Sequence, residues 1–357
     1  MKKLLPLLLA LALLLSGCGR REDTPPDPVK DPPAGTEEPG EVLPITGEHP
    51  LELDILRIEI CRGGLGSERL MEAVRTLPEL LRAALADYHM IADAVQVTIG
   101  SSPAATVQAL NEGTVDIAIL PAVGFAGQET EAAVLLASGP QSGNEIWKEG
   151  EGAFRGALYT SAYSLLGKEG ELPAWTELDR LPWGLLEQDS IPGRRAVDLW
   201  LAEHYEGRTT ADLSHTAVYE TFDQLLQAAE AGEAVLFPLD DITSETWEGE
   251  SRRRFVLLGE LETFYDMVLA VSPKREELSA PELNLRDPLM SALTRLCFYD
   301  GTQTNPDGTP AFPGDGYDRK TRMLCQDVFG PCRYGWAEDK DLDAARRLAA
   351  LEGHTAD

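Results

Sequence analysis

The turn at residues 190–193, with the sequence SIPG, is a candidate anion site. It precedes a helical pattern, and a helix N-terminus presents free backbone N–H groups and a partial positive charge. Arg194 and Arg195 follow directly and would add positive charge. The expected ligand contacts are Ser190, Ile191 and Gly193. The alternative is an ordinary serine cap with proline in the first helical turn.

A glycine-rich loop, residues 62–67 with the sequence RGGLGS, follows the first predicted strand. Its three glycines would let the backbone approach a ligand closely. The loop lacks the spacing of the dinucleotide-binding fingerprint, and no acidic residue follows at the end of the second predicted strand. We expect ligand contacts from Arg62, Gly63, Gly66 and Ser67, with a tight turn as the alternative.

Carboxylates and aromatic rings supply the other candidates. Asp240 and Asp241 follow a predicted strand, where they would contact a cationic or hydroxylated group and oppose an anion. A solvated loop is the alternative for both. Four aromatic residues could line a cleft, although core packing is the commoner position for such side chains. They are Phe125, Trp183, Tyr219 and Tyr265.

Metal-binding and catalytic patterns are missing from the sequence. Residues 300–318 combine Asp and Asn with glycine but lack EF-hand spacing. The five histidines show no ligand spacing, and no Ser-His-Asp set or G-x-S-x-G motif occurs. We therefore expect no metal, no cofactor and no enzymatic activity.

The elements that position these residues begin with the stretch 107–126. A helical run passes through Gly113 into the apolar strand 115–120, and Pro121 opens a loop that is a further candidate site. Such a strand suits a parallel sheet covered on both faces, whose ligands bind beyond the carboxyl ends of the strands. Residues 52–138 as a whole predict the order β-α-β-α-β-β.

A second α/β block follows. Its predicted strands are 158–165, 183–186, 216–218 and 234–239, and its helices are 194–205 and 221–231. The order helix, Gly232, apolar strand, proline repeats that of the first block, which predicts two similar lobes. Strands 255–258 and 265–271 are expected to return the chain to the first lobe, followed by helices 288–296 and 341–351.

Composition bounds the partners and the number of domains. The 357 residues, 43% of them hydrophobic, provide material for about two domains. Asp and Glu number 60 against 31 Lys and Arg, a formal net charge of −29. Nucleic-acid binding needs concentrated positive charge, so we expect no nucleic-acid partner.

The N-terminus predicts export. Two lysines and the apolar run 4–15 form a signal peptide too short to span a membrane comfortably. The following LSGC resembles the bacterial lipobox, whose cysteine, here Cys18, is diacylated. We expect residues 1–17 to be cleaved and the chain to be anchored to the membrane by lipid, with an ordinary cleaved signal as the alternative. Residues 18–50 are rich in Pro, Glu, Asp and Gly and predict a disordered tether.

Four further cysteines remain in this exported chain, and an even number suggests disulfides. The local pair Cys325 and Cys332 is the expected disulfide, inside the Gly-, Pro- and Asp-rich segment 297–336. Buried free thiols are the alternative for all four, the other two being Cys61 and Cys297.

The order of elements and the stretch ALNEGTVDIAILPAVGF resemble the phosphate/phosphite/phosphonate-binding proteins of ABC importers. Ala109-Leu110, Gly113 and Val115-Asp116 match the helix-to-strand step of that family. The chain has Pro-Ala where the family has Gly-Pro, and Phe125 stands where a ligand-facing tyrosine would be. The resemblance covers roughly residues 52–296 as a pattern of elements.

The second block continues the resemblance with departures. Ser190 and Gly193 match the family's Ser-x-Ser-Gly turn, but proline replaces the second serine. Thr221 and Asp223 occupy the place of a Ser-His-Asp set, whose histidine is absent. The departures, Phe125 included, remove polar groups, each worth roughly 1.5–3 kcal/mol in a charged hydrogen bond. An oxyanion would therefore have fewer donors here.

The resemblance implies an α/β, type II periplasmic-binding-protein fold, with two lobes, a hinge and an inter-lobe cleft. We expect lobe 1 at residues 51–150, lobe 2 at 151–262, and the return to lobe 1 with a C-terminal extension at 263–357. The implied function is capture of a small, phosphonate-like or other solute for an ABC permease by a monomer outside the cell membrane. Hinges are expected near residues 137–156 and 258–267. A non-transport lipoprotein, an enzyme and a sensory binding lobe are the alternatives.

Overall fold

The computed structural model describes residues 45–63, 65–139, 154–162, 172–247, 252–275, 278, 284–298, 304, 308–309, 317–330 and 333–355. The predicted signal peptide, Cys18, most of the tether and Cys332 lie outside the described residues. Within these ranges, no helix combines the length and the apolar character needed to cross a bilayer.

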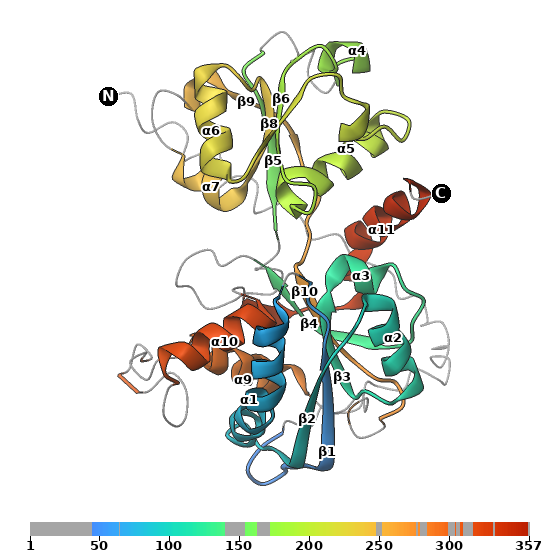
Figure 1. Ribbon diagram of the computed structural model, residues 1–357, viewed down its shortest axis with the longest axis vertical. Helices are drawn as coiled ribbons and strands as arrows, with labels where there is room; N and C mark the ends of the chain where they lie inside the picture. Colours follow the sequence, from blue (N-terminus) through green and yellow to red (C-terminus); the bar gives the residue numbers. More distant parts are fainter. Residues whose placement is uncertain are drawn as a thin grey trace, which may run out of the picture. The chain divides into compact units, whose positions relative to one another are not determined.

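The first sheet has six strands in the order β11-β4-β10-β3-β1-β2 (Figure 1). β1 is parallel to β2 and β3, and β10 lies antiparallel between β3 and β4. The predicted strands and helices of the first block occur in the predicted chain order, with one additional short helix at Ala122–Ala126 between the third and fourth strands. The strands are β1 (Leu51–Ile60), β2 (Met90–Ile99), β3 (Ile117–Pro121), β4 (Ala133–Gly139), β10 (Met267–Val271) and β11 (Arg333–Trp336).

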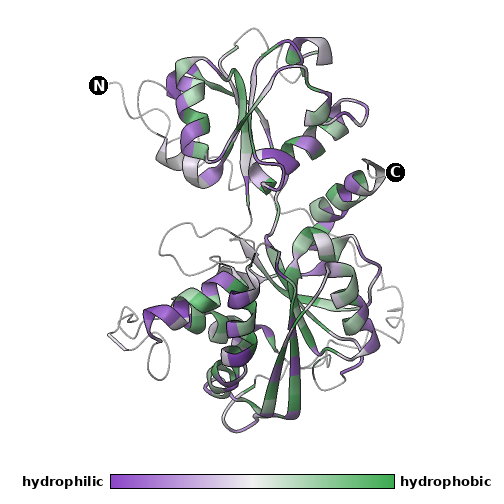
Figure 2. Cartoon of the chain, viewed as in Figure 1, coloured by the Kyte–Doolittle hydropathy of each residue, from purple (hydrophilic) through white to green (hydrophobic). Residues whose placement is uncertain are grey.

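Helices pack against this sheet because each has one apolar face. Figure 2 shows hydrophobic residues concentrated on the strands and hydrophilic residues on the outer sides of the helices. α1 contacts β2, α9 and α10, whereas α11 contacts α3. The elements are α1 (Ser67–Ala86), α2 (Pro103–Glu112), α3 (Ala122–Ala126), α9 (Arg286–Phe298), α10 (Arg319–Phe329), the turn η5 (Asp339–Leu342) and α11 (Asp343–Thr355).

The second sheet has five strands in the order β7-β6-β8-β5-β9. β6 is parallel to β7 and β8, whereas β5 is antiparallel to β8 and β9. The strands are β5 (Gly156–Thr160), β6 (Trp183–Leu186), β7 (Thr216–Tyr219), β8 (Leu236–Asp240) and β9 (Val256–Glu260). The helices and turns are α4 (Trp175–Leu178), η2 (Ile191–Arg195), α5 (Ala196–His204), η3 (Thr210–Asp212), α6 (Phe222–Ala231), α7 (Asp241–Thr246) and η4 (Arg252–Arg254).

The two sheets share one strand order. In the first sheet, the parallel strands β2, β1 and β3 lie side by side, and the antiparallel strand β10 separates β3 from β4. In the second sheet, β7, β6 and β8 take the same places, and the antiparallel strand β5 separates β8 from β9. That antiparallel strand is the one on which the chain enters the sheet from the other sheet, β5 in one case and β10 in the other. Two α/β lobes of this topology form the type II periplasmic-binding-protein fold, so the predicted fold class is confirmed.

The repeated sequence pattern has a clear physical basis. α2 ends at Gly113 with φ 75°, and α6 ends at Gly232 with φ 81°. Side chains other than glycine rarely adopt this left-handed conformation, which ends a helix and redirects the chain. β3 follows the first glycine and β8 follows the second, so the two stretches occupy equivalent positions in their sheets.

Two sequence expectations need correction, and one segment for which no helix or strand was predicted contains both. The strand predicted at 255–258 is part of β9, which pairs with β5 and so belongs to the second sheet. The segment after Pro121 is the short helix α3 rather than a loop. The segment 297–336 contains α10 and the edge strand β11, which pairs with β4.

The described cysteines are free thiols. Cys61, Cys297 and Cys325 are all buried and unpaired with one another, so the expected disulfide between Cys325 and Cys332 is not formed. Burial raises the pKa of Cys325 to about 12 and that of Cys297 well above its usual value. Both thiols are therefore protonated and unreactive at neutral pH, as the alternative of buried free thiols expected.

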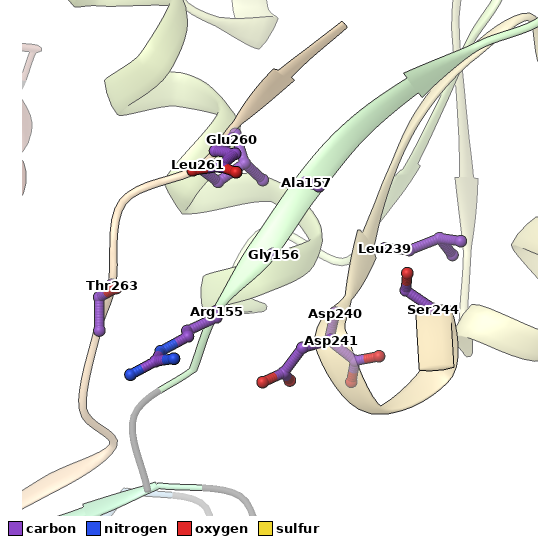
Figure 3. A pocket seen from close by; sticks show the side chains of 10 residues that line it. All are labelled: Arg155, Gly156, Ala157, Leu239, Asp240, Asp241, Ser244, Glu260, Leu261 and Thr263. Carbon is purple, nitrogen blue, oxygen red and sulfur yellow. The ribbon is translucent and has the colours of Figure 1, made fainter. Parts of the chain in front are cut away.

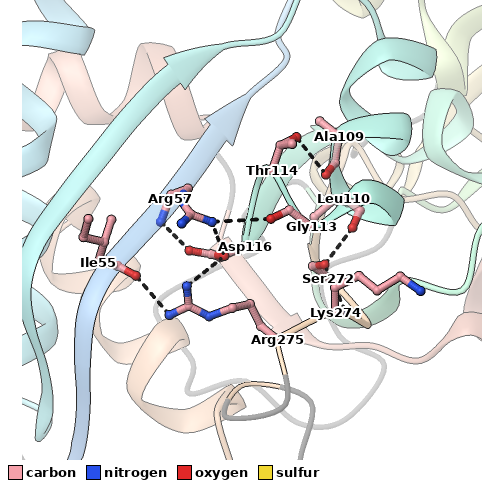
Figure 4. Close-up of polar contacts among 10 residues, drawn as sticks. All are labelled: Ile55, Arg57, Ala109, Leu110, Gly113, Thr114, Asp116, Ser272, Lys274 and Arg275. Carbon is pink, nitrogen blue, oxygen red and sulfur yellow. Dashed lines mark hydrogen bonds and ion pairs between the residues drawn. The ribbon is translucent and has the colours of Figure 1, made fainter.

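Asp116 holds the amino end of β3 in place (Figure 4). Its carboxylate is fully buried and accepts a hydrogen bond of 2.8 Å from the Arg57 backbone N–H. The guanidinium groups of Arg57 and Arg275 lie 3.5 and 3.3 Å from its Oδ1. Arg275 also donates to the Ile55 carbonyl. Asp116, which matches the family pattern, is therefore a structural residue that joins β1, β3 and the segment after β10.

Candidate functional site

The carboxyl ends of β6, β7 and β8 lie at one edge of the second sheet, because the three strands are parallel. Each strand is followed by a helix whose N-terminus is at this edge: η2 with α5, α6 and α7 respectively. Ligands of open α/β sheets bind outside this kind of edge. The polar sequence candidates of the second block are all found here, whereas Trp183 lies at the amino end of β6.

Three of those candidates are helix caps. The Ser190 Oγ accepts from the Gly193 N–H at 3.2 Å, and the Thr221 Oγ1 accepts from the Gln224 N–H at 3.2 Å. The Asp240 Oδ1 accepts from the Thr243 N–H at 2.8 Å. These bonds satisfy N–H groups that a helix leaves free at its first turn. Asp223 lies exposed in the first turn of α6.

The turn 190–193 packs closely against the protein core, and the two arginines after it are hydrogen-bonded within the protein. A Cβ on Gly193 would lie 2.5 Å from the Leu186 side chain, so only glycine fits there. Ile191 is half-buried against the core. The Arg194 Nε donates to the Thr210 hydroxyl, and Arg195 forms two hydrogen bonds with the Glu352 carboxylate. Both arginines thus have other partners than the expected anion.

The loop after β1 has free space beside two of its glycines. Added Cβ atoms at Gly63 and Gly66 would meet nothing within 4 Å, and α1 begins at Ser67 without a side-chain cap. The Arg62 guanidinium lies 3.8 Å from the Asp266 carboxylate. Burial raises the pKa of Asp266, and the guanidinium of Arg62 opposes that rise. A carboxylate beside Arg62 makes this loop a weaker anion site than its sequence suggests.

Phe125 does not face a ligand. Its ring is 1% exposed and packs into the core beneath α3, which corrects the expectation of a cleft wall. Trp183 is also buried, and its Nε1 donates to the Leu178 carbonyl at 3.0 Å. Tyr265 is buried as well, whereas Tyr219 is half-buried. Core packing, the alternative interpretation, therefore describes Phe125, Trp183 and Tyr265.

A cavity of about 310 Å³ opens at the edge of the second sheet (Figure 3). Ligand-sized pockets start at roughly this volume. Its wall comes from the start of β5, the junction of β8 with α7, and the end of β9. The polar side chains of the wall are Arg155, Asp240, Asp241, Ser244, Glu260 and Thr263.

Strand pairing explains why these residues meet. β5 runs antiparallel to β8, so Gly156, next to Arg155, pairs with Asp240. β9 runs antiparallel to β5, which places Glu260 opposite Ala157. The Asp241 N–H donates to the Arg155 carbonyl at 3.1 Å. Sequence reasoning identified Asp240 and Asp241 but missed Arg155 and Glu260, because no local pattern shows which strands become neighbours.

A second cavity, of about 380 Å³, lies against α3 and α11. The charged side chains of its wall are Arg195 and Glu352, which are hydrogen-bonded to each other. Their charges are therefore already balanced, and the cavity offers a ligand little electrostatic attraction. Among the described residues, no group of three or more His, Cys, Asp or Glu side chains could hold a metal ion.

No protein-family model matches the chain, and no curated protein sequence matches it. Solved structures do match. PhnD1 from Prochlorococcus marinus, in complex with methylphosphonate, is 12% identical, with 84% of this chain and 98% of that chain covered and a TM-score of 0.39. A binding protein component of an ABC phosphonate transporter from Pseudomonas aeruginosa is 11% identical, with 85% and 96% covered and a TM-score of 0.34.

XAC2383 from Xanthomonas citri, bound to ATP, is 12% identical, with 85% of this chain and 98% of that chain covered and a TM-score of 0.42. Phosphonate-transport proteins, the group that the sequence resembles, are thus among the structures similar to this chain. The strand orders of the two sheets, and not these similarities, carry the assignment of the fold.

Proposed function

We propose that the protein is an extracytoplasmic solute-binding lipoprotein that captures a small ligand and delivers it to an ABC importer. The observation that carries the proposal is the cavity beyond the carboxyl end of β8, in a fold of two lobes with one topology. Binding at such an edge, followed by closure of two lobes about a hinge, is how this class of protein retains a solute. The crossover segments near residues 137–156 and 258–267 would act as the hinge.

The proposal includes the predicted cellular location and the predicted partners. Diacylation of Cys18 would hold the chain at the outer face of the cell membrane, because two acyl chains anchor stably where one does not. The partners are the small-molecule ligand and an ABC permease, and the chain acts as a monomer. No cofactor and no catalytic step are part of the proposed function.

A thermal-shift screen of the full chain tests the binding role. The panel contains organic amines, amino acids, carboxylates, sulfonates, inorganic phosphate and methylphosphonate. A bound ligand at 100 times its dissociation constant stabilises the folded state by about 2.7 kcal/mol, so at least one class is expected to raise the unfolding temperature. No shift with any class would contradict the proposal. Chemical turnover of a panel member would favour the enzyme alternative.

A further inference from the structure

The wall of the cavity at the second sheet is unequally charged. Three carboxylates, those of Asp240, Asp241 and Glu260, line the cavity together with one guanidinium, that of Arg155. Figure 3 shows the Asp241 carboxylate on the side facing Arg155, with Glu260 on the neighbouring strand. The charged side chains of the wall thus carry a formal charge of three negative against one positive. The cavity would therefore repel an anion, and it attracts a group with positive charge.

The cavity also indicates what kind of cation it takes. No three of its acidic groups come together in a metal-holding cluster among the described residues. A metal ion needs several ligands in one cluster, whereas an organic ammonium group needs only a few hydrogen-bond acceptors. Hydroxyl groups stand beside the carboxylates: Thr263, and Ser244, whose Oγ lies 2.8 Å from the Tyr159 hydroxyl. Carboxylates and hydroxyls accept the hydrogen bonds that an ammonium group donates.

We propose that the solute captured in this cavity carries an organic ammonium group, which the carboxylates of the wall, Asp240 and Glu260 among them, attract. This inference rests on the proposed solute-binding function and names the chemical class of the ligand. Where the solute also has an anionic end, Arg155 is the group that contacts it. The cavity thereby differs from an oxyanion site, which needs converging donors.

Substitutions separate charge from structure at this site. Asp240→Asn removes the negative charge but keeps an oxygen that can accept from the Thr243 N–H, and asparagine caps helices as well as aspartate does. Glu260→Gln removes the charge of an exposed side chain. Asp318→Asn is the matched control, because Asp318 caps α10 through the same kind of bond to Thr321 and lies outside the cavity.

The test is calorimetric titration of the full chain and its variants with putrescine, γ-aminobutyrate, butyrate and methylphosphonate. Butyrate matches the carbon chain of γ-aminobutyrate and lacks its ammonium group. We expect an ammonium probe to bind and butyrate not to bind. We expect Asp240→Asn and Glu260→Gln each to weaken ammonium binding about 10- to 100-fold, with Asp318→Asn unchanged.

Other results would overturn the inference in distinguishable ways. Tighter binding of butyrate or methylphosphonate than of the ammonium probes would refute the ligand class while leaving solute binding intact. Ammonium binding that is unchanged in both cavity variants would refute the assignment to this cavity. Absence of binding by putrescine and γ-aminobutyrate, when a carboxylate, a sulfonate or phosphate stabilises the chain, would also refute the ligand class. Absence of binding across the whole panel would remove the proposed function as well.

Discussion

Replacing Asp116 by alanine is expected to lower the free energy of unfolding by about 3–5 kcal/mol, the usual loss when one member of a buried ion pair is removed. Asp116 is fully buried, and its removal takes the acceptor from the Arg57 backbone N–H. The guanidinium groups of Arg57 and Arg275 would lose their shared anion. Asp116→Asn keeps a side-chain oxygen for the N–H and should cost less. Urea unfolding followed by circular dichroism measures both changes.

Asp93→Asn provides the control for this prediction. Asp93 is an exposed carboxylate on β2, two strands away in the same sheet. Its substitution should change the free energy of unfolding by no more than about 0.5 kcal/mol. If Asp116→Ala proved as mild as Asp93→Asn, the ionic cluster would not hold β3 in place, and the Val-Asp pattern would need a functional explanation.

Replacing Phe125 by alanine should lower the free energy of unfolding by about 3–5 kcal/mol, as expected for a large ring removed from a packed core. Phe125→Tyr should lower the free energy of unfolding by about 1–3 kcal/mol, because the added hydroxyl would be buried without a hydrogen-bond partner. Restoring the tyrosine of the resembling family should not create affinity for methylphosphonate. Thermal unfolding and calorimetric titration measure the two effects.

Phe222→Ala is the matched control for Phe125. Phe222 is half-buried in the first turn of α6, so its removal leaves less of a cavity and should cost less stability than Phe125→Ala. A Phe125→Tyr variant with unchanged stability and a newly measurable affinity for methylphosphonate would show that this ring faces a ligand after all.

Much of the fold follows from local sequence signals. The apolar runs that became β3, β6 and β8 and the glycine stops at Gly113 and Gly232 all act within a few residues. α10 and β11 were missed for a different reason. The segment around them is rich in Gly, Pro and Asp, and β11 is a four-residue edge strand whose existence depends on pairing with distant β4.

The site was less predictable, because it is built by strands that are distant in the sequence. Asp240 could be identified at the end of an apolar strand, but the positions of Arg155 and Glu260 depend on β5 lying between β8 and β9. Phe125 was misplaced because an apolar stretch after a strand does not reveal whether it stays a loop or forms a buried helix. The residues that looked most polar at helix starts, Ser190 and Thr221, turned out to satisfy their own helices.

The central claim is that a small solute binds at the carboxyl edge of the second sheet. Hydrogen–deuterium exchange of the full chain, with and without the panel compound that stabilises it most, tests this claim directly. We predict slower exchange at residues 154–157, 239–244 and 260–263, which include the cavity wall. Protection confined to other segments, with these three unchanged, would contradict it.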